Sequence, residues 1–316
     1  MNNFFDNQRI LSLIWKRKFH FVLVGIISIV LSGIFSGPGF IKPKFKSTAR
    51  IYPTNLAVVS DESRTEQLLE IISSQDVTLK MLDAFELNVV YGIRKDDPYY
   101  LTTMLDMYNE NVSASKTEYE TVEIKVMDYL PERASNMCDS IIHFYNRKVG
   151  EMHKAKNLEM VEIAQRLLKK KYVEIDSIKT QLNNIIKEYG ILDFKNQVPE
   201  ITRGYMKTLV AGKGATTDGK KVQDIYSNFS DQGLQAQLLE SRFKNVAGAI
   251  DSLTLLYEVY LNEYEKDITY CNVVQHPLPA EKKSYPVRWL IVACSTVAAV
   301  FLALLVFLLL DYRKKD

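Results

Sequence analysis

The sequence of 316 residues lacks most of what catalytic and metal sites require. Three cysteines and four histidines are too few for a disulfide framework or a structural zinc site. The histidines show no HxxxH or HExxH spacing, and no GxSxG motif is present. Forty basic and thirty-eight acidic residues leave a net charge of +2, which argues against a strongly basic nucleic-acid binder. We therefore expect a protein that is not an enzyme and that needs no cofactor or metal.

Two weaker sequence patterns resemble a phosphate-binding loop and a disulfide pair. Gly214 is followed after four residues by Gly219 and Lys220, as in a phosphate-binding loop, but the next residue is Lys221 where magnesium binding needs Ser or Thr. This stretch is interpreted as a flexible basic loop. Cys138 and Cys271 could form a disulfide in an oxidising compartment or could serve as small buried residues, and the sequence leaves both readings open.

Long hydrophobic runs are present only near the two ends of the chain. The first begins at Phe19 and reaches about Phe35, and the second extends from Trp289 to Leu310. About 20 apolar residues span the hydrocarbon core of a bilayer. A cleaved signal peptide is the alternative for the first run, but its n-region has eighteen residues and no A-x-A-like cleavage site follows. We expect transmembrane helices at 19–40 and 287–310.

Basic residues beside the two spans predict their orientation. Lys16, Arg17 and Lys18 precede the first span, and residues 313–315 after the second are also basic. Both termini are therefore expected in the cytoplasm, with 1–18 an amphipathic lead and 311–316 a short tail. Five lysines at the outer ends give a contrary signal, but charge in a long segment has less influence on topology. These are Lys42, Lys44, Lys46, Lys282 and Lys283.

Small residues recur at every fourth position within the spans. Ser28, Ser32 and Ser36 form one stripe, and Gly33 and Gly37 form a GxxxG motif. The second span carries Ser295, Ala299 and Ala303. Because such stripes allow helix backbones to approach closely in lipid, we expect specific packing between the spans or with a partner protein.

Residues 41–130 predict a small domain of helices and strands next to the membrane. Residues 45–52 alternate, with Ser47, Ala49 and Ile51 on one face, which is typical of a half-buried strand. Helices are expected at 64–72, 76–85 and 97–108, and Ser63 with Glu66 forms a capping-box pattern before the first. Further strands are expected at 112–115 and 121–127.

Two long helices dominate the region from 131 to 267. Pro131 opens the first, which extends to Gly190 with apolar residues at three- and four-residue steps. The second, 234–266, follows a coiled-coil pattern that includes Leu239, Val246 and Ile250. They predict an antiparallel hairpin with a distal loop at about 191–230 that has room for a short helix at 200–210. The Lys169–Lys171 run and the tyrosines at 257, 260 and 264 are explained by a solvated face and by core packing, with glycan contact as the alternative.

A final strand at 268–274 and a proline-bearing connector complete the outer region at 286. Pro277, Pro279 and Pro286 favour an extended chain entering the second span. The expected fold class is therefore α+β, with two transmembrane helices flanking a membrane-proximal α/β base and a long helical hairpin.

The order of these segments resembles the chain-length-determinant (Wzz-type) family, also called polysaccharide co-polymerases. Three segments carry the resemblance: the lead that contains Leu11, Ile14 and Trp15 and ends in basic residues, the strand FKSTARIYP at 45–53, and the proline-bearing connector. The final span lacks the glycines often found in the family, and the six residues after Leu310 leave no room for the tyrosine-kinase domain of the fused members.

The resemblance implies a non-enzymatic homo-oligomer of the bacterial inner membrane, with its bulk in the periplasm. Its partners would be a membrane-embedded polysaccharide polymerase and the growing lipid-linked polysaccharide, whose length it sets in O-antigen, capsule or exopolysaccharide. The strand around Ser47, Ala49, Ile51 and Tyr52, the connector prolines, and the stripe Ser295, Ala299 and Ala303 are the candidate assembly and partner residues. A two-span sensor or receptor and a periplasmic adaptor of an export system are the alternatives, but the chain lacks a cytoplasmic output module and a glycine-punctuated β-series.

Overall fold

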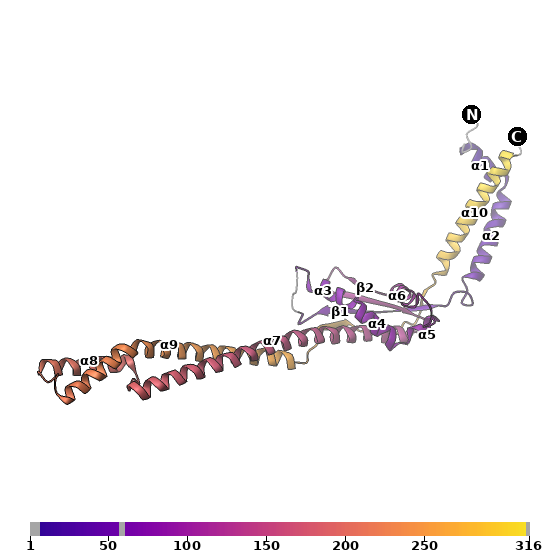
Figure 1. Ribbon diagram of the computed structural model, residues 1–316. Helices are drawn as coiled ribbons and strands as arrows, with labels where there is room; N and C mark the ends of the chain where they lie inside the picture. Colours follow the sequence, from indigo (N-terminus) through magenta and orange to yellow (C-terminus); the bar gives the residue numbers. More distant parts are fainter. Residues whose placement is uncertain (1–6, 57–60, 314–316) are drawn as a thin grey trace. The chain divides into compact units, whose positions relative to one another are not determined.

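The structure of the chain is a computed structural model that describes residues 7–56 and 61–313 (Figure 1). It divides into two compact units. One contains the described residues up to Val149 together with those from Thr269 onward, and the other contains Gly150–Ile268. The first unit holds the terminal helices and a small sheet, and the second holds a helical hairpin. The fold is α+β, as the sequence predicts.

Two apolar helices near the ends of the chain lie side by side. After the short helix α1 (Asn7–Lys16), helix α2 covers Lys18–Phe35, and α10 covers Arg288–Arg313 (Figure 1). Within the described residues, Lys18–Phe35 and Arg288–Asp311 are long and apolar enough to cross a membrane. Helix α2 ends at Phe35 because residues 36–40 form turns, so the first helix is shorter than the expected 19–40.

The first unit is built on a five-stranded antiparallel sheet. Strands β2 (Val112–Lys116), β3 (Val122–Asp128), β1 (Lys44–Pro53) and β4 (Cys271–Gln275) follow in that order, and β5 (Lys283–Tyr285) also pairs with β1. Strand β3 follows one edge of β1 along most of its length, so β4 and β5 share the other edge. The strand expected at 268–274 begins later in the structure, and β5 was not expected.

Alternation along the strands decides which face of the sheet is buried. Ser47, Ala49 and Ile51 of β1 are buried, and so are Val122, Ile124 and Val126 of β3. Side chains of period two share one face of a strand, so both strands turn the same apolar face inward. The predicted alternation of β1 and β3 is confirmed.

Four helices follow β1 and precede β2 in the chain. They are α3 (Arg64–Ile72), α4 (Gln75–Ala84), α5 (Leu87–Tyr91) and α6 (Tyr100–Asn111). The capping box at the start of α3 is confirmed, since Ser63 Oγ accepts from Glu66 N at 3.2 Å and Glu66 Oε2 accepts from Ser63 N at 2.8 Å.

Helix α7 (Pro131–Tyr189) begins in the first unit, and its first turns belong to the core beneath the sheet. Asp128, buried just before it, accepts hydrogen bonds from Leu130 N at 2.9 Å and from Arg133 Nε at 2.9 Å. Met137, Ile141 and other apolar residues of its first five turns are buried. The predicted start of the long helix at Pro131 is confirmed.

In the second unit, α7 continues against α9 (Thr217–Glu265). Ile178 and Ile185 of α7 share one buried cluster with Leu239, Val246 and Ile250 of α9, which confirms the coiled-coil seam. Tyr172, which the pattern places in the seam, is 53% exposed. Its position follows from the helix period, because the four-residue step from Leu168 turns it roughly 40° beyond a full turn, toward the margin of the seam.

Residues 191–230 differ from the expected loop. Helix α8 covers Phe194–Val210, and α9 already begins at Thr217. Pro199 and several glycines make this segment look weakly helical in sequence, but aromatic packing stabilises it. The rings of Phe194 and Phe229 stack at 6.4 Å between centroids, and those of Tyr205 and Tyr226 stack at 4.3 Å.

The glycines of this segment are needed for close contact. A Cβ on Gly219 would lie 2.1 Å from Lys213 O, and one on Gly233 would lie 1.8 Å from the Phe194 ring. Gly219 therefore belongs to the tight start of α9, where its N–H also donates to Thr216 Oγ1 at 3.1 Å. The glycine pattern that resembled a phosphate-binding loop has a packing role.

Candidate functional site

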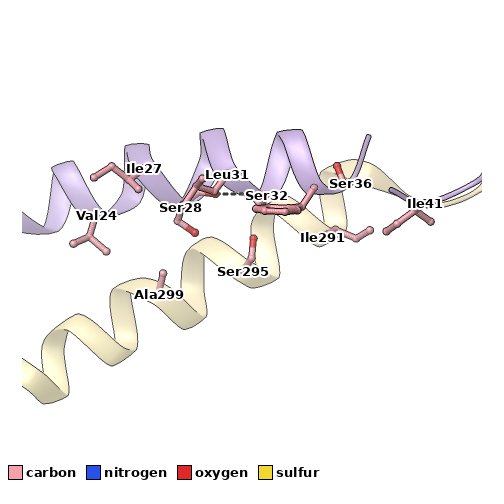
Figure 2. Close-up of a pocket in the computed structure, with 11 residues that line it drawn as sticks. Val24, Ile27, Ser28, Leu31, Ser32, Ser36, Ile41, Ile291, Ser295 and Ala299 are labelled. Atoms are coloured by element: carbon pink, nitrogen blue, oxygen red, sulfur yellow. Dashed lines mark hydrogen bonds between the residues drawn. The ribbon is translucent and has the colours of Figure 1, made fainter. Parts of the chain in front are cut away.

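The two apolar helices enclose a groove that gathers the small residues singled out in the sequence. Ser28 and Ser32 of α2 and Ser36, just after its end, line it together with Ser295 and Ala299 of α10 (Figure 2). The groove has a volume of about 620 Å³, and its remaining lining is apolar. Further lining comes from Val24, Ile27, Leu31, Phe35, Ile41 and Ile291.

Three serine hydroxyls in the groove donate to backbone carbonyls three or four residues earlier in the chain. Ser32 Oγ donates to Ser28 O at 2.6 Å, and Ser295 Oγ donates to Val292 O at 3.0 Å. Ser36 Oγ donates to Gly33 O at 3.3 Å. The small side chains of the groove leave room for an apolar chain or a further helix.

Other members of the predicted stripes lie outside this groove. Ala303 lies one turn further along α10 than Ala299 and does not line it. Gly33 lines a second groove of about 640 Å³ that also includes Arg288 and Trp289. Gly37 follows the end of α2, so the GxxxG pattern does not continue on a helix face.

One end of the helix pair is fixed by aromatic and cationic contacts. The Arg17 guanidinium lies 4.7 Å from the centre of the Phe307 ring, and Phe21 meets the same ring edge-on at 5.2 Å. Leu13 of α1 and Leu308 of α10 are buried. These contacts join the basic lead and α2 to the C-terminal half of α10.

The proline-bearing connector is held to the base by two serine hydroxyls. Ser47 Oγ of β1 donates to Leu278 O at 3.0 Å, and Ser135 Oγ of α7 donates to Pro277 O at 3.2 Å. Both serines and Pro277 are buried, as is Pro286, whereas Pro279 is exposed. Two candidates far apart in the sequence, Ser47 and Pro277, are thus brought together.

The remaining β1 candidates have different surroundings. Ala49 and Ile51 are fully buried in the core of the protomer, and both edges of β1 are occupied by strands. Tyr52 is 47% exposed. Of this group, Tyr52 therefore reaches the surface of the chain, while Ser47, Ala49 and Ile51 are buried in the base.

The structure contains a polar network near the start of β1 that the sequence did not indicate. Lys44 Nζ donates to the buried Asn111 Oδ1 at 2.6 Å, and Asn111 Nδ2 donates to Met107 O at 2.6 Å. Nearby, burial raises the pKa of Tyr91 to about 12, with the charge of Asp128 acting in the same direction. The sequence signal for this network was weak, because Asn111 ends a helix where polar residues are common.

The two outer cysteines are both free and buried. Burial raises the pKa of Cys138 to about 12, although hydrogen bonding involving Ser47 acts against this increase. Cys271 Sγ accepts from Asn146 Nδ2 at 3.4 Å, and burial raises its pKa as well. The sequence left two interpretations open, and in the structure Cys138 and Cys271 are small buried residues without a disulfide between them.

The described part of the chain contains no group of three or more His, Cys, Asp or Glu side chains placed to hold a metal ion. The carboxylates of Asp128 and Glu120 instead form ion pairs with basic side chains. Arg133 Nη2 lies 2.7 Å from Asp128 Oδ1, and Lys116 Nζ lies 2.9 Å from Glu120 Oε1. The chemistry of the site is therefore that of packing and hydrogen bonding.

A family model matches the N-terminal part of the chain. Residues 3–85 match the model of the chain length determinant protein (Wzz) family. This segment contains the lead, the first span, β1, α3 and α4. The resemblance indicated by the sequence motifs is confirmed. No curated protein matches the sequence.

Solved structures similar to this chain are polysaccharide co-polymerases. A full-length bacterial polysaccharide co-polymerase is 13% identical with a TM-score of 0.49, and the match covers 98% of this chain and 99% of that one. The Shigella flexneri lipopolysaccharide O-antigen chain-length regulator is 14% identical with a TM-score of 0.33, covering 76% and 100%. A Wzz dodecamer fitted to a cryo-EM map is 14% identical with a TM-score of 0.32, covering 75% and 98%. Likeness at these values carries no information on function.

Proposed function

We propose that this protein regulates the chain length of a bacterial surface polysaccharide without being an enzyme. It would act as an oligomeric inner-membrane co-polymerase together with a polysaccharide polymerase. The observation that carries the proposal is the match of residues 3–85 to the chain length determinant family. The polymer would be an O-antigen, a capsule or an exopolysaccharide.

The proposed topology places both termini in the cytoplasm and residues 41–286 in the periplasm. Lys16, Arg17 and Lys18 lie at the start of α2, and basic residues are favoured on the cytoplasmic side of a span. Both long helices of the hairpin and the sheet lie between the two spans in the chain. The bulk of the protein is then positioned where surface glycans are extended.

Exposed apolar side chains on the hairpin support the proposed homo-oligomer. Leu234, Leu238 and Leu255 of α9 are 73%, 60% and 64% exposed in the single chain. Leu234 and Leu238 lie one turn apart on α9, and neighbouring large apolar side chains exposed on a helix in water indicate a contact surface. Neighbouring copies of the chain would cover them, and a ring of copies would hold polymerases or the growing glycan so that release follows a certain length.

The groove between α2 and α10 is the proposed contact for the polymerase. Its small residues would admit a partner helix within van der Waals distance, as in other small-residue interfaces in lipid. Ser295→Leu with Ala299→Leu would fill it. Leu302→Phe is the matched control, since Leu302 is 61% exposed and does not line the groove.

The test is electrophoresis of surface polysaccharide from a deletion strain complemented with each form. Deletion should broaden or shift the length distribution, and the native gene and Leu302→Phe should restore it. The double groove variant, present at native abundance in the membrane, should restore it poorly. An unchanged distribution in the deletion strain would refute the proposed function.

A further inference from the structure

Five lysines and one arginine lie where the chain enters and leaves its two apolar helices, and the positive-inside rule does not explain them. We name these residues the cationic collar. The collar consists of Lys42, Lys44, Lys46, Lys282, Lys283 and Arg288.

Strand pairing brings the two halves of the collar together. β1 and β5 are antiparallel neighbours, with Lys44 opposite Tyr285 and Phe45 opposite Lys283. The first group follows α2 in the chain and the second precedes α10, more than 230 residues later. Cations from both entrances therefore share one end of the sheet.

Chain length limits how far the collar can lie from the bilayer. Lys42 is seven residues beyond Phe35, the end of α2, and Arg288 is the first residue of α10. Since an extended chain spans at most about 3.6 Å per residue, Lys42 lies within about 25 Å of Phe35. Lys283, five residues before Arg288, lies within about 18 Å of it by the same limit. The collar therefore lies at or near the headgroup region of any membrane that the helices cross.

The collar's charge is almost uncompensated. Lys42, Lys46, Lys282, Lys283 and Arg288 are exposed, and none of them forms an ion pair with a carboxylate in the part of the chain that the structure describes. Glu281 is the acidic residue next to them in sequence. Lys44 is held by Asn111 and lies 5.9 Å from the Tyr285 ring centre, so its position is fixed while its charge remains. Exposed cations without partners attract anions.

Aromatic side chains lie near the same ends of the two apolar helices. Trp289 is 72% exposed and Phe40 is 64% exposed, each within a few residues of a span end. Exposed aromatic rings beside apolar helices are typical of the interface between lipid and water. Arg288 and Trp289 also line the mouth of the second groove between α2 and α10.

We propose that the cationic collar binds the phosphate groups of anionic phospholipids in the leaflet that faces the base. The collar combines mostly exposed cations, interfacial aromatic rings and an apolar groove that an acyl chain fits. An acidic glycan would match the charge but would leave the aromatic rings and the groove without a role. This inference goes beyond length regulation and concerns how the base is held on the membrane.

The two tryptophans of the chain provide the assay. They are Trp15 and Trp289, so Trp15→Phe leaves Trp289, in the collar region, as the single tryptophan. The full chain carrying Trp15→Phe is reconstituted in vesicles of phosphatidylcholine. Phosphatidylglycerol or phosphatidylcholine, brominated near the glycerol end of an acyl chain, is then titrated in and the quenching of Trp289 is measured.

The expected result is preferential quenching by phosphatidylglycerol. An interfacial basic residue contributes about 1 kcal/mol of attraction to an anionic surface. The relative binding constant of phosphatidylglycerol should therefore be about fivefold or more above that of phosphatidylcholine. Lys282→Gln, Lys283→Gln and Arg288→Gln together should bring the ratio close to one. High salt should also reduce it.

The matched control removes an equal charge from the second unit. Lys169→Gln, Lys170→Gln and Lys171→Gln lie on α7 and should leave the ratio unchanged. Equal quenching by the two lipids overturns the proposal, and so does a preference that survives the triple collar variant. Complete displacement of brominated phosphatidylglycerol by a low mole fraction of a polyprenyl diphosphate also overturns it, because the collar would then select the lipid-linked substrate.

Discussion

Cys138 shows what a single position contributes to the base. It lies on the first part of α7 in contact with Ser47, Ala49 and Val126, which belong to the two central strands. Its side chain is fully buried, and the low-polarity surroundings disfavour the thiolate. The residue therefore fills the space between helix and sheet as a small apolar group, and the chemistry of a free thiol is suppressed by its location.

Slow modification of the native thiols follows from this burial. With a pKa of about 12 for Cys138, only about one thiol in ten thousand is ionised at pH 8. In a Cys294→Ala background, a water-soluble maleimide should leave the folded chain unmodified for hours and should label two cysteines after denaturation, as mass spectrometry would report. Rapid labelling of the folded protein would contradict the packing of α7 on the sheet.

The raised pKa of Cys138 also determines the direction in which the stability of the fold changes with pH. The folded state favours the protonated thiol, so its contribution to stability is present below the ordinary value of 9.0. It is lost as the pH rises toward about 12, at about 1.4 kcal/mol per pH unit. Tyr91, whose pKa is raised to about 12, and the buried Tyr108 and Tyr145, whose pKa values are also raised, act in the same direction.

At the scale of elements, the contact between α8 and α9 depends on one glycine. The Phe194 ring stacks on Phe229 and occupies the space where Gly233 has no side chain. Gly248 lies on the same helix with nothing within 4 Å of the position its Cβ would take. The two glycines are chemically identical but differ in what surrounds them, which makes them a matched pair.

Gly233→Ala should weaken the docking of α8, whereas Gly248→Ala should not. An added methyl group would displace Phe194, at a cost of roughly 1–3 kcal/mol for overpacking. Alanine at 248 should instead favour the helix by roughly 0.5–1 kcal/mol. Hydrogen exchange of α8 amides in the full chain measures the first effect, and exchange of α9 amides near residue 248 measures the second. If Phe194 is first replaced by Ala, Gly233→Ala should cost little, and an undiminished cost in that background would disprove the clash.

At the scale of the whole molecule, the two apolar helices α2 and α10 lie near opposite ends of the chain. α2 and α10 pack on each other, and the intervening chain forms the base and the hairpin. Arg17 of the lead and Phe21 of α2 both contact Phe307 in the C-terminal half of α10. The start of α2 is thus tied to the C-terminal half of α10.

Thiol labelling in intact cells tests the proposed topology. In a Cys294→Ala background, Lys244→Cys on the exposed surface of α9 should react with a membrane-impermeant maleimide in spheroplasts. Lys314→Cys in the C-terminal tail should react only after the inner membrane is permeabilised. Labelling in the reverse order would contradict the orientation, and the native buried thiols provide the background control.

The sequence by itself determined the elements whose cause is local. Hydrophobic run length gave the spans, strict alternation gave β1 and β3, and the Ser63–Glu66 capping box gave the start of α3. The coiled-coil seam was also predictable, because three- and four-residue steps repeat over many turns of both helices. The motifs of the lead, β1 and the connector were enough to indicate the family that residues 3–85 match.

Only the tertiary structure decided what depends on distant contacts. It turned residues 194–210 and 217–230 into helix through stacking of Phe194 and Tyr205 on α9, against their glycine and proline content. It placed Ser47 against Leu278 and brought Lys44 and Lys46 of β1 close to Lys283 of β5. These outcomes rest on pairs of residues up to about 240 positions apart, and local propensity holds no information on such pairs because their energy appears only when the chain has folded.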